Sequence, residues 1–196
     1  MTGRPRSFDE SEVLEKAMAL FWSQGYEATA LSELTEAMGI GRQSLYDTFG
    51  DKHSLFTRAL THYLETTLNE AAQTLEAIET PSGKIREWLS HAVLGLCIGG
   101  AEPRGCFALN TVVERCPGDE SIAGVMKSHH GKMMTLLCGI LSAGQETGEF
   151  RRDYAPKDLT TMVLSCSAGL VVTSKLQPPP EVGEKAVEML LAFLKG

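Results

Sequence analysis

Apolar residues recur along this chain at intervals of three and four, the spacing of one face of an α-helix. Between residues 10 and 24 this stripe consists of Val13, Leu14, Ala17, Met18 and Phe21. Comparable stripes predict further helices at 30–38, 42–48, 52–79, 83–99, 105–115, 119–147, 156–175 and 181–195. No stretch alternates with a period of two over a useful length. The pattern therefore predicts an all-α fold of about nine helices.

Capping and turn residues mark the expected ends of these helices. Ser7 and Glu10 have the spacing of a capping box at the start of the first helix. Gly25 follows the last residue of its apolar stripe, and Thr29 is placed to cap the second helix.

The turn Gly39-Ile40-Gly41 joins the short helices predicted at 30–38 and 42–48. Two short helices joined by a glycine-containing turn form a helix-turn-helix, whose second helix lies in the major groove of DNA. Arginine suits guanine and glutamine suits adenine, while hydroxyls and a lysine suit phosphates. The candidate DNA contacts are Thr29, Ser32, Arg42, Gln43, Ser44, Tyr46, Thr48 and Lys52. The same pattern also fits a helical corner in a bundle that never touches DNA.

Residues 8–64 strongly resemble the N-terminal domain of TetR/AcrR-type transcriptional regulators. The resemblance rests on Phe8, Ala17, Leu20, Phe21, Gly25, Tyr26, Thr29, Leu34, Gly39, Ile40, Ser44, Leu45, Tyr46, Phe49, Lys52, Leu55 and Phe56. The rest of the chain is similar in length and helical breakup to that family's second domain. The resemblance implies a helix-turn-helix DNA-binding domain over 1–52 and an effector-binding and dimerisation domain over 53–196. Thr48 departs from the family pattern, which often has a larger His or Tyr there that contacts phosphate.

The resemblance also implies a function. Such proteins are homodimeric repressors that bind a palindromic operator and are released by a small-molecule effector. We expect a cytoplasmic protein and no enzyme, because no catalytic triad, carboxylate pair or phosphate-binding loop stands out. A helical ligand-binding protein without DNA binding is the alternative. The expected dimer surface lies on the last two large helices, with Leu159, Met162, Val163, Cys166, Leu170, Val187, Leu190, Leu191 and Leu194, unless these residues form intrachain core.

An effector pocket of this kind has a mostly apolar lining with a few polar groups, which suits an apolar or amphipathic ligand. The candidates are Trp88, Cys97, Cys106, Phe107, Asn110, Met126, His130, Met134 and Met162. At helical spacing, residues of these types also form ordinary core. We expect no cofactor and no metal: His129 and His130 diverge by about 100° on a helix, so one should be buried and the other exposed.

The five cysteines are widely spaced and form no C-x-x-C motif, so neither a disulfide framework nor a zinc site is expected. Cys106 and Cys116 lie close in sequence to Arg104 and Arg115. A neighbouring guanidinium lowers the pKa of a thiol and favours the reactive thiolate. A repressor that senses oxidants or electrophiles through cysteine is therefore a second alternative.

The net charge of −7 first argues against DNA binding, because nucleic-acid-binding domains tend to be basic. Even residues 1–52 hold only five basic groups against nine acidic ones. We therefore expect Glu12, Glu15, Glu27 and Glu36 to face solvent, while Arg4, Arg6, Arg42 and Lys52 line the contact side. Few phosphate contacts per subunit predict a modest salt dependence. No apolar window approaches the roughly 18 residues of a membrane span, and no secretory signal is expected.

Overall fold

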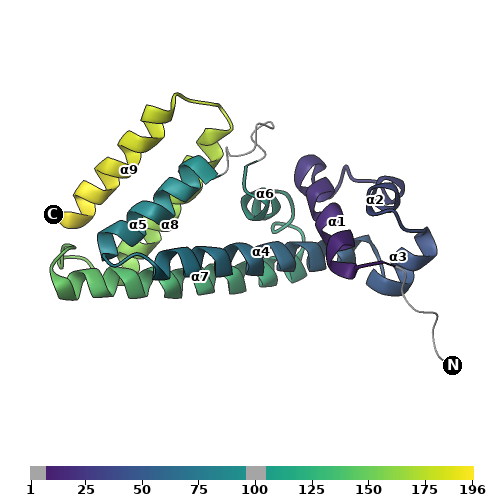
Figure 1. The fold of residues 1–196 in the computed structure, drawn as a ribbon, viewed down its shortest axis with the longest axis horizontal. Coiled ribbons are helices and arrows are strands. Elements are labelled where there is room, and N and C mark those ends of the chain that lie inside the picture. The colour runs from purple at the N-terminus through teal and green to yellow at the C-terminus, as the bar shows by residue number, and fades with distance from the viewer. Residues whose placement is uncertain (1–7, 96–104) are drawn as a thin grey trace.

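The computed structural model describes residues 8–95 and 105–196. Over these ranges it contains nine α-helices and no strand, so the predicted all-α class is confirmed (Figure 1). The helices are α1 (Glu10–Gln24), α2 (Leu31–Met38), α3 (Arg42–Phe49), α4 (Lys52–Glu76), α5 (Pro81–Ser90), α6 (Phe107–Glu114), α7 (Glu120–Thr147), α8 (Pro156–Ser174) and α9 (Pro180–Lys195). A π-helical turn, η1 (His91–Gly95), follows α5. Among the described helices, none is both long enough and apolar enough to cross a bilayer.

The molecule is elongated, with helices α1 to α3 gathered into a head at one end (Figure 1). Helices α4 and α7 run side by side along its length, while α5, α8 and α9 pack together at the far end. The first turns of α4 and α7 meet at the head, where His53 Nε2 lies 2.8 Å from Asp119 Oδ2. Helix α6 stands between the head and the body.

Two hydrophobic cores hold these parts together. The first joins Phe21, Leu34 and Leu45 of the head to Phe56 of α4, and it also includes Phe107 of α6. The second, at the far end, is built from the end of α4 together with α5, α7, α8 and α9. Because α6 and the start of α7 contribute to the first core, the head is packed against the body rather than tethered to it.

Two of the predicted helix caps and the bounds of one predicted helix are wrong. Asp9, not Ser7, caps α1, since its carboxylate accepts from the amide of Ser11 at 2.9 Å; Glu10 is then the first helical residue and too early to complete a capping box. Ser7 lies outside the described residues. Ala30 precedes α2, and Thr29 instead donates its hydroxyl to the carbonyl of Gly25 at 2.5 Å. The helix predicted at 83–99 begins earlier, at Pro81, and becomes the π-helical turn at His91.

Most residues of the predicted dimer surface form intrachain core instead, which is the alternative that the sequence left open. On α8 and α9, the fully buried residues Leu159, Val163, Val187, Leu191 and Leu194 belong to the second core of their own chain. A different set of apolar residues on or next to these helices remains exposed: Val172, Leu176, Val182, Met189 and Phe193. Periodicity marks the apolar positions of both sets, but only the packing of the monomer decides which set stays outside.

Candidate DNA-reading head and effector cavity

The turn between α2 and α3 depends on a glycine backbone. Gly39 has a φ of 67°, a left-handed conformation that L-residues other than glycine rarely adopt. The amide of Ile40 closes the turn by donating to the carbonyl of Thr35 at 3.1 Å. Helix α3 then buries Leu45 and Phe49 in the head, so its opposite face points outward.

The outward face of α3 carries the chemistry expected of a recognition helix. Arg42, Gln43, Tyr46 and Asp47 are exposed, with 47% of the Tyr46 side chain open to solvent. Gln43 donates its amide to the carboxylate of Asp47 at 2.7 Å. Arg42 makes no hydrogen bond or ion pair with the described residues, so its five guanidinium donors are free for base edges or phosphates.

The other predicted DNA contacts differ in how accessible they are. Ser32 is exposed, whereas Ser44 and Thr48 are half-buried on α3. Thr29 is only 1% exposed and its hydroxyl is engaged with Gly25, so its side chain supports the turn rather than facing a phosphate. Lys52 lies over the ring of Tyr26, with Nζ 4.4 Å from the ring centroid.

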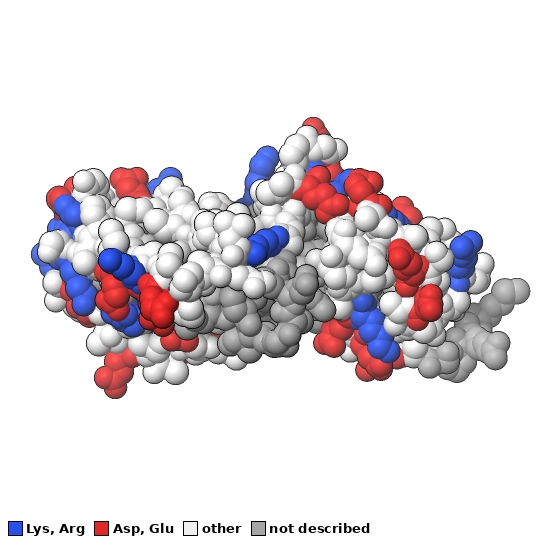
Figure 2. All heavy atoms as spheres, turned by 90° about the horizontal axis from the view of Figure 1, so that it is seen from above, with Lys and Arg blue, Asp and Glu red and all other residues white. Residues whose placement is uncertain are grey.

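Two basic groups in or beside the described head, Lys16 of α1 and Arg58 of α4, are paired with carboxylates. Lys16 pairs with Glu12 at 2.7 Å, and Arg58 pairs with Glu10. Arg58, which the sequence analysis did not select, also donates to the carbonyl of Thr48 at 3.2 Å and so buttresses the end of α3. Figure 2 shows basic and acidic side chains interspersed over both ends of the face it presents. The head is therefore not a uniformly positive surface.

The expected exposure of Glu12, Glu15, Glu27 and Glu36 is confirmed. Of the four cations expected on the contact side, Arg4 and Arg6 lie outside the described residues.

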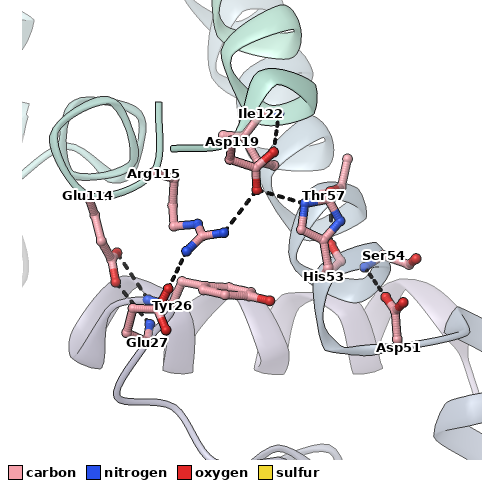
Figure 3. A network of polar contacts seen from close by, with 10 residues as sticks. All are labelled: Tyr26, Glu27, Asp51, His53, Ser54, Thr57, Glu114, Arg115, Asp119 and Ile122. Carbon is pink, nitrogen blue, oxygen red and sulfur yellow. Dashed lines mark hydrogen bonds and ion pairs between the residues drawn. The ribbon is translucent and has the colours of Figure 1, made fainter. Parts of the chain in front are cut away.

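A polar network joins the head to the body (Figure 3). The carboxylate of Glu114, the last residue of α6, accepts hydrogen bonds from the amides of Tyr26 at 3.0 Å and Glu27 at 2.9 Å. The next residue, Arg115, forms an ion pair with Glu27 and lies 4.2 Å from the centroid of the Tyr26 ring. The end of α6 thus holds the loop between α1 and α2.

Asp119 extends this network to α4 and α7. Its carboxylate caps α7 by accepting from the amide of Ile122 at 3.0 Å, and it also contacts Arg115 at 2.9 Å and His53 at 2.8 Å. The Ile122 amide, with smaller contributions from Arg115 and His53, lowers the pKa of Asp119 to about 2, against the opposing effect of burial. One carboxylate therefore connects the starts of both long helices.

An aromatic cluster makes the second junction. Trp22 of α1 donates its indole N–H to the carbonyl of Gly105 at 3.0 Å. Its ring packs edge-on against Tyr63 at 5.2 Å, and Tyr63 packs against Phe107 at 5.5 Å. The hydroxyl of Tyr63 lies 3.6 Å from Sγ of Cys106, and burial raises the pKa of this tyrosine. Phe107 is thus core between head and body.

A cavity of about 910 Å³ opens among α4, α5, η1, α6, α7 and α8. Its volume lies toward the upper end for small-molecule sites, and its lining is mostly apolar, as predicted. Four of the predicted effector residues line it: Trp88, Cys106, Met126 and His130. The indole of Trp88 donates to the hydroxyl of Ser167 at 3.1 Å, which fixes one wall.

The other predicted effector residues are not brought together there. Phe107 and Asn110 lie instead beside a second hollow between α1, α6 and the end of α8, where Asn110 accepts from Lys175 Nζ at 2.7 Å. Met162 packs against the second core. Met133, rather than its neighbour Met134, reaches the cavity. Cys97 lies outside the described residues.

Sequence reasoning missed the wall that α4 provides and, on α7, Ala123, Lys127, His129 and Met133. The α4 wall comprises Tyr63, Thr67, Leu68, Glu70, Ala71, Thr74 and Leu75. Thr67 and Thr74 are seven residues apart and therefore share one face of α4. This spacing was the signal in the sequence that could have indicated a polar stripe facing the cavity. Of the histidine pair, His129 is buried and His130 exposed, as expected, yet both line the cavity.

The predicted activation of Cys116 is wrong. This thiol lines the cavity, but burial and then the charge of Asp119 raise its pKa. Arg115, expected to lower it, is committed to Glu27 and Asp119, while Arg104 lies outside the described residues. The four described cysteines are all free thiols. Within the described ranges, no three His, Cys, Asp or Glu side chains gather as metal ligands.

A helix-turn-helix head packed against a cavity-bearing helical body is the architecture of ligand-responsive transcriptional regulators. The family model described as bacterial regulatory proteins, tetR family, matches residues 13–59, and the tetracyclin repressor-like C-terminal domain matches residues 83–190. The chain therefore belongs to the TetR family.

Named relatives agree with this assignment. The chain is 34% identical over 149 residues to the HTH-type transcriptional repressor ComR of Escherichia coli (strain K12), covering 75% of this chain and 70% of the relative. It is 33% identical over 122 residues to the repressor BdcR of the same organism, covering 62% and 61%.

The fold is also found in solved structures. A cysteine mutant of the TetR family regulator CifR, complexed with 26bp double-strand operator DNA, superposes with a TM-score of 0.84 at 31% identity, covering 98% of this chain and 100% of CifR. The reduced form of E. coli NemR gives a TM-score of 0.85 at 17% identity, covering 94% and 95%, and this likeness concerns the fold alone.

Proposed function

We propose that this protein is a homodimeric repressor that binds a palindromic operator in the cytoplasm, acts as a regulator rather than an enzyme, and is released by a small apolar or amphipathic effector. The observation that carries the proposal is the double role of α6. This helix lines the cavity with Ala108, Leu109 and Val112, and it ends in Glu114, which holds the α1–α2 loop.

This arrangement gives an effector a physical route to the DNA-reading head. A ligand shifts the protein toward whichever state binds it more tightly. If that state has α6 displaced, Glu114 and Arg115 move with it, and the head turns relative to α4. The ligand then lowers the affinity for the operator, and by linkage the operator lowers the affinity for the ligand to the same extent.

The exposed apolar residues of α8 and α9 support a dimer. Val182, Met189 and Phe193 lie seven and four residues apart on α9, so they share one face, and 66% of the Met189 side chain is exposed. Pairing of this face with that of a second copy removes apolar surface from water. A two-fold dimer then presents two copies of α3 to half-sites roughly 34–36 Å apart.

The proposed base contacts are made by Arg42 and Gln43, with Ser44 beside them. Ser32, Tyr46, Thr48 and Lys52 contact phosphates and set the register. For Gln43 to contact a base, its amide turns from Asp47, and for Lys52 to reach a phosphate, its ammonium leaves the ring of Tyr26. Both rearrangements break contacts that the protein makes without DNA.

The test is selection of bound duplexes from a random DNA library, followed by fluorescence anisotropy with the enriched sequence. We expect a palindromic sequence bound with two protomers per duplex. Recovery of no enriched sequence, with no salt-dependent binding to any duplex, would show that the chain is a ligand-binding protein without DNA binding.

A second candidate, release through cysteine modification, is favoured by one observation. Cys106 lines the cavity and lies directly before α6, so a group attached to its sulfur presses on the helix that holds the head. With N-ethylmaleimide, the sulfur would bond to one alkene carbon and the adjacent carbon would take up a proton. If Cys106→Ser protein still releases the operator under the same reagent, this candidate fails.

A further inference from the structure

His129 is a largely buried imidazole in the wall of the cavity. It lies on α7, lines the cavity and is only 9% exposed. No described residue makes a hydrogen bond with its ring. A neutral imidazole has one N–H donor and one nitrogen acceptor, and buried groups of this kind are normally paired. The ring nitrogens of His129 are not sealed off from the cavity, so a ligand there can replace water as their hydrogen-bond partner.

The walls around His129 suit a flat aromatic ring. Met126 and Met133 lie three residues before and four residues after it, so they share its face of α7, and both line the cavity. Trp88 and Tyr63 line it from α5 and α4. Thioether sulfurs and aromatic side chains pack favourably against an aromatic ring. These side chains therefore suit a ligand with an aromatic skeleton.

The charges around His129 decide which polar group it accepts. Burial, followed by the charges of Lys132 and His130, lowers the pKa of His129, which keeps the ring neutral and leaves one nitrogen as an acceptor. Lys127 also lines the cavity, and Glu70 and Glu87 line it from α4 and α5. A ligand hydroxyl with an acidic proton donates strongly to such a nitrogen.

We infer that the cavity takes a phenolic aromatic compound whose hydroxyl donates a hydrogen bond to the ring of His129. This inference rests on the proposed function, in which the cavity is the effector site. An aromatic ether of the same skeleton has no proton to donate, so it leaves the acceptor nitrogen unpaired. The hydroxyl proton is the discriminating feature.

The experiment is isothermal titration calorimetry of the full-length protein with 4-phenylphenol and with 4-methoxybiphenyl. We expect the phenol to bind at least about tenfold more tightly than the ether, a difference equivalent to one well-placed hydrogen bond. His129→Leu should remove this preference. His130→Leu is the matched control, because it changes the adjacent exposed imidazole, and it should retain the preference. Circular dichroism melts verify that each variant is folded, and His129→Phe, which also lacks an acceptor, replaces His129→Leu if the latter is not.

The outcomes separate the inference from the proposed function. Equal binding of phenol and ether by the wild type, or a preference that survives in both His129 variants, overturns the role of His129. Absence of binding by both probes also overturns it, while operator binding measured in parallel by anisotropy shows whether the regulator itself is intact. If the His129 variant loses the preference for the phenol but the wild-type protein binds no operator, the role of His129 is supported and the proposed repressor function is rejected.

Discussion

The side chain of Glu114, at the end of α6, accepts a hydrogen bond from the backbone amide of Tyr26, 3.0 Å away in the head. Because the same carboxylate also accepts from Glu27, one side chain holds two consecutive amides of the α1–α2 loop. Glu114 and Tyr26 are 88 residues apart in the sequence. A movement of α6 therefore moves the α1–α2 loop of the head with it.

Removal of this carboxylate should loosen the head. We expect Glu114→Ala to lower the free energy of unfolding by about 1–2 kcal/mol, because hydrogen bonds to charged groups contribute about that much when they are partly exposed. Urea denaturation measures the change. Glu65→Ala removes an exposed carboxylate from the middle of α4 and should have almost no effect. An unchanged stability in the Glu114 variant would mean that solvent satisfies these two amides equally well.

Substitution of Arg42 should reduce specific DNA binding. We expect Arg42→Ala to weaken operator binding by about 1–3 kcal/mol and to relax the preference at one base position, whereas Lys52→Ala weakens binding to all sequences alike. Anisotropy with operator and scrambled duplexes distinguishes the two effects. Lys16→Ala is the matched control, since it removes a head cation that is paired with Glu12. If Arg42→Ala weakens binding to the operator and to the scrambled duplex equally, Arg42 contacts the DNA backbone and not a base.

The low pKa of Asp119 predicts a specific dependence of stability on pH. Its pKa is about 2 in the folded protein, below the ordinary value of 3.8. The folded state therefore favours the carboxylate, and this stabilisation is present above about pH 4 and is lost as the pH falls toward 2. Asp119→Asn should lower stability at pH 7 and flatten the profile between these values.

The measurement is urea unfolding as a function of pH. Asp158→Asn, which alters an exposed aspartate in the first turn of α8, gives the baseline for loss of one carboxylate. If the Asp119 variant keeps the full acid dependence of the wild type, other carboxylates are responsible for it.

Two glycines of α7 should respond in opposite ways to the same substitution. A Cβ at Gly144 would collide with the buried ring of Phe150, so Gly144→Ala should destabilise the protein by about 1–3 kcal/mol. A Cβ at Gly139 meets no atom, so Gly139→Ala should stabilise the helix by roughly 0.5–1 kcal/mol. Thermal melts compare the two. A stabilising Gly144→Ala would show that Phe150 moves aside without loss.

The exposed apolar face of α9 should control assembly. We expect Met189→Glu to convert the proposed dimer to a monomer, because a buried unpaired carboxylate at an interface is strongly unfavourable. Light scattering coupled to size-exclusion chromatography gives the mass. Glu184→Lys changes a charge on the opposite side of the helix and should leave the mass unchanged. A dimeric Met189→Glu protein would place the interface elsewhere.

The sequence by itself predicted the helices and the reading motif. Helix α1 was predicted to the residue, and Gly39 indicated the turn, because both depend on local periodicity and local backbone freedom. The outward residues of α3 followed for the same reason, since burial of Leu45 and Phe49 fixes the rotation of a short helix.

Tertiary structure alone decided the cavity, the junction and the exposed face. Whether Met133 or Met134 reaches the cavity depends on a rotation of about 100° that only packing sets. Glu114 and Tyr26 are distant in sequence, and no pattern along the chain predicts their contact. Leu191 and Met189 are both apolar residues of α9, yet one is core and the other surface. Periodicity specifies that a helix has an apolar face, whereas long-range contacts determine what that face meets.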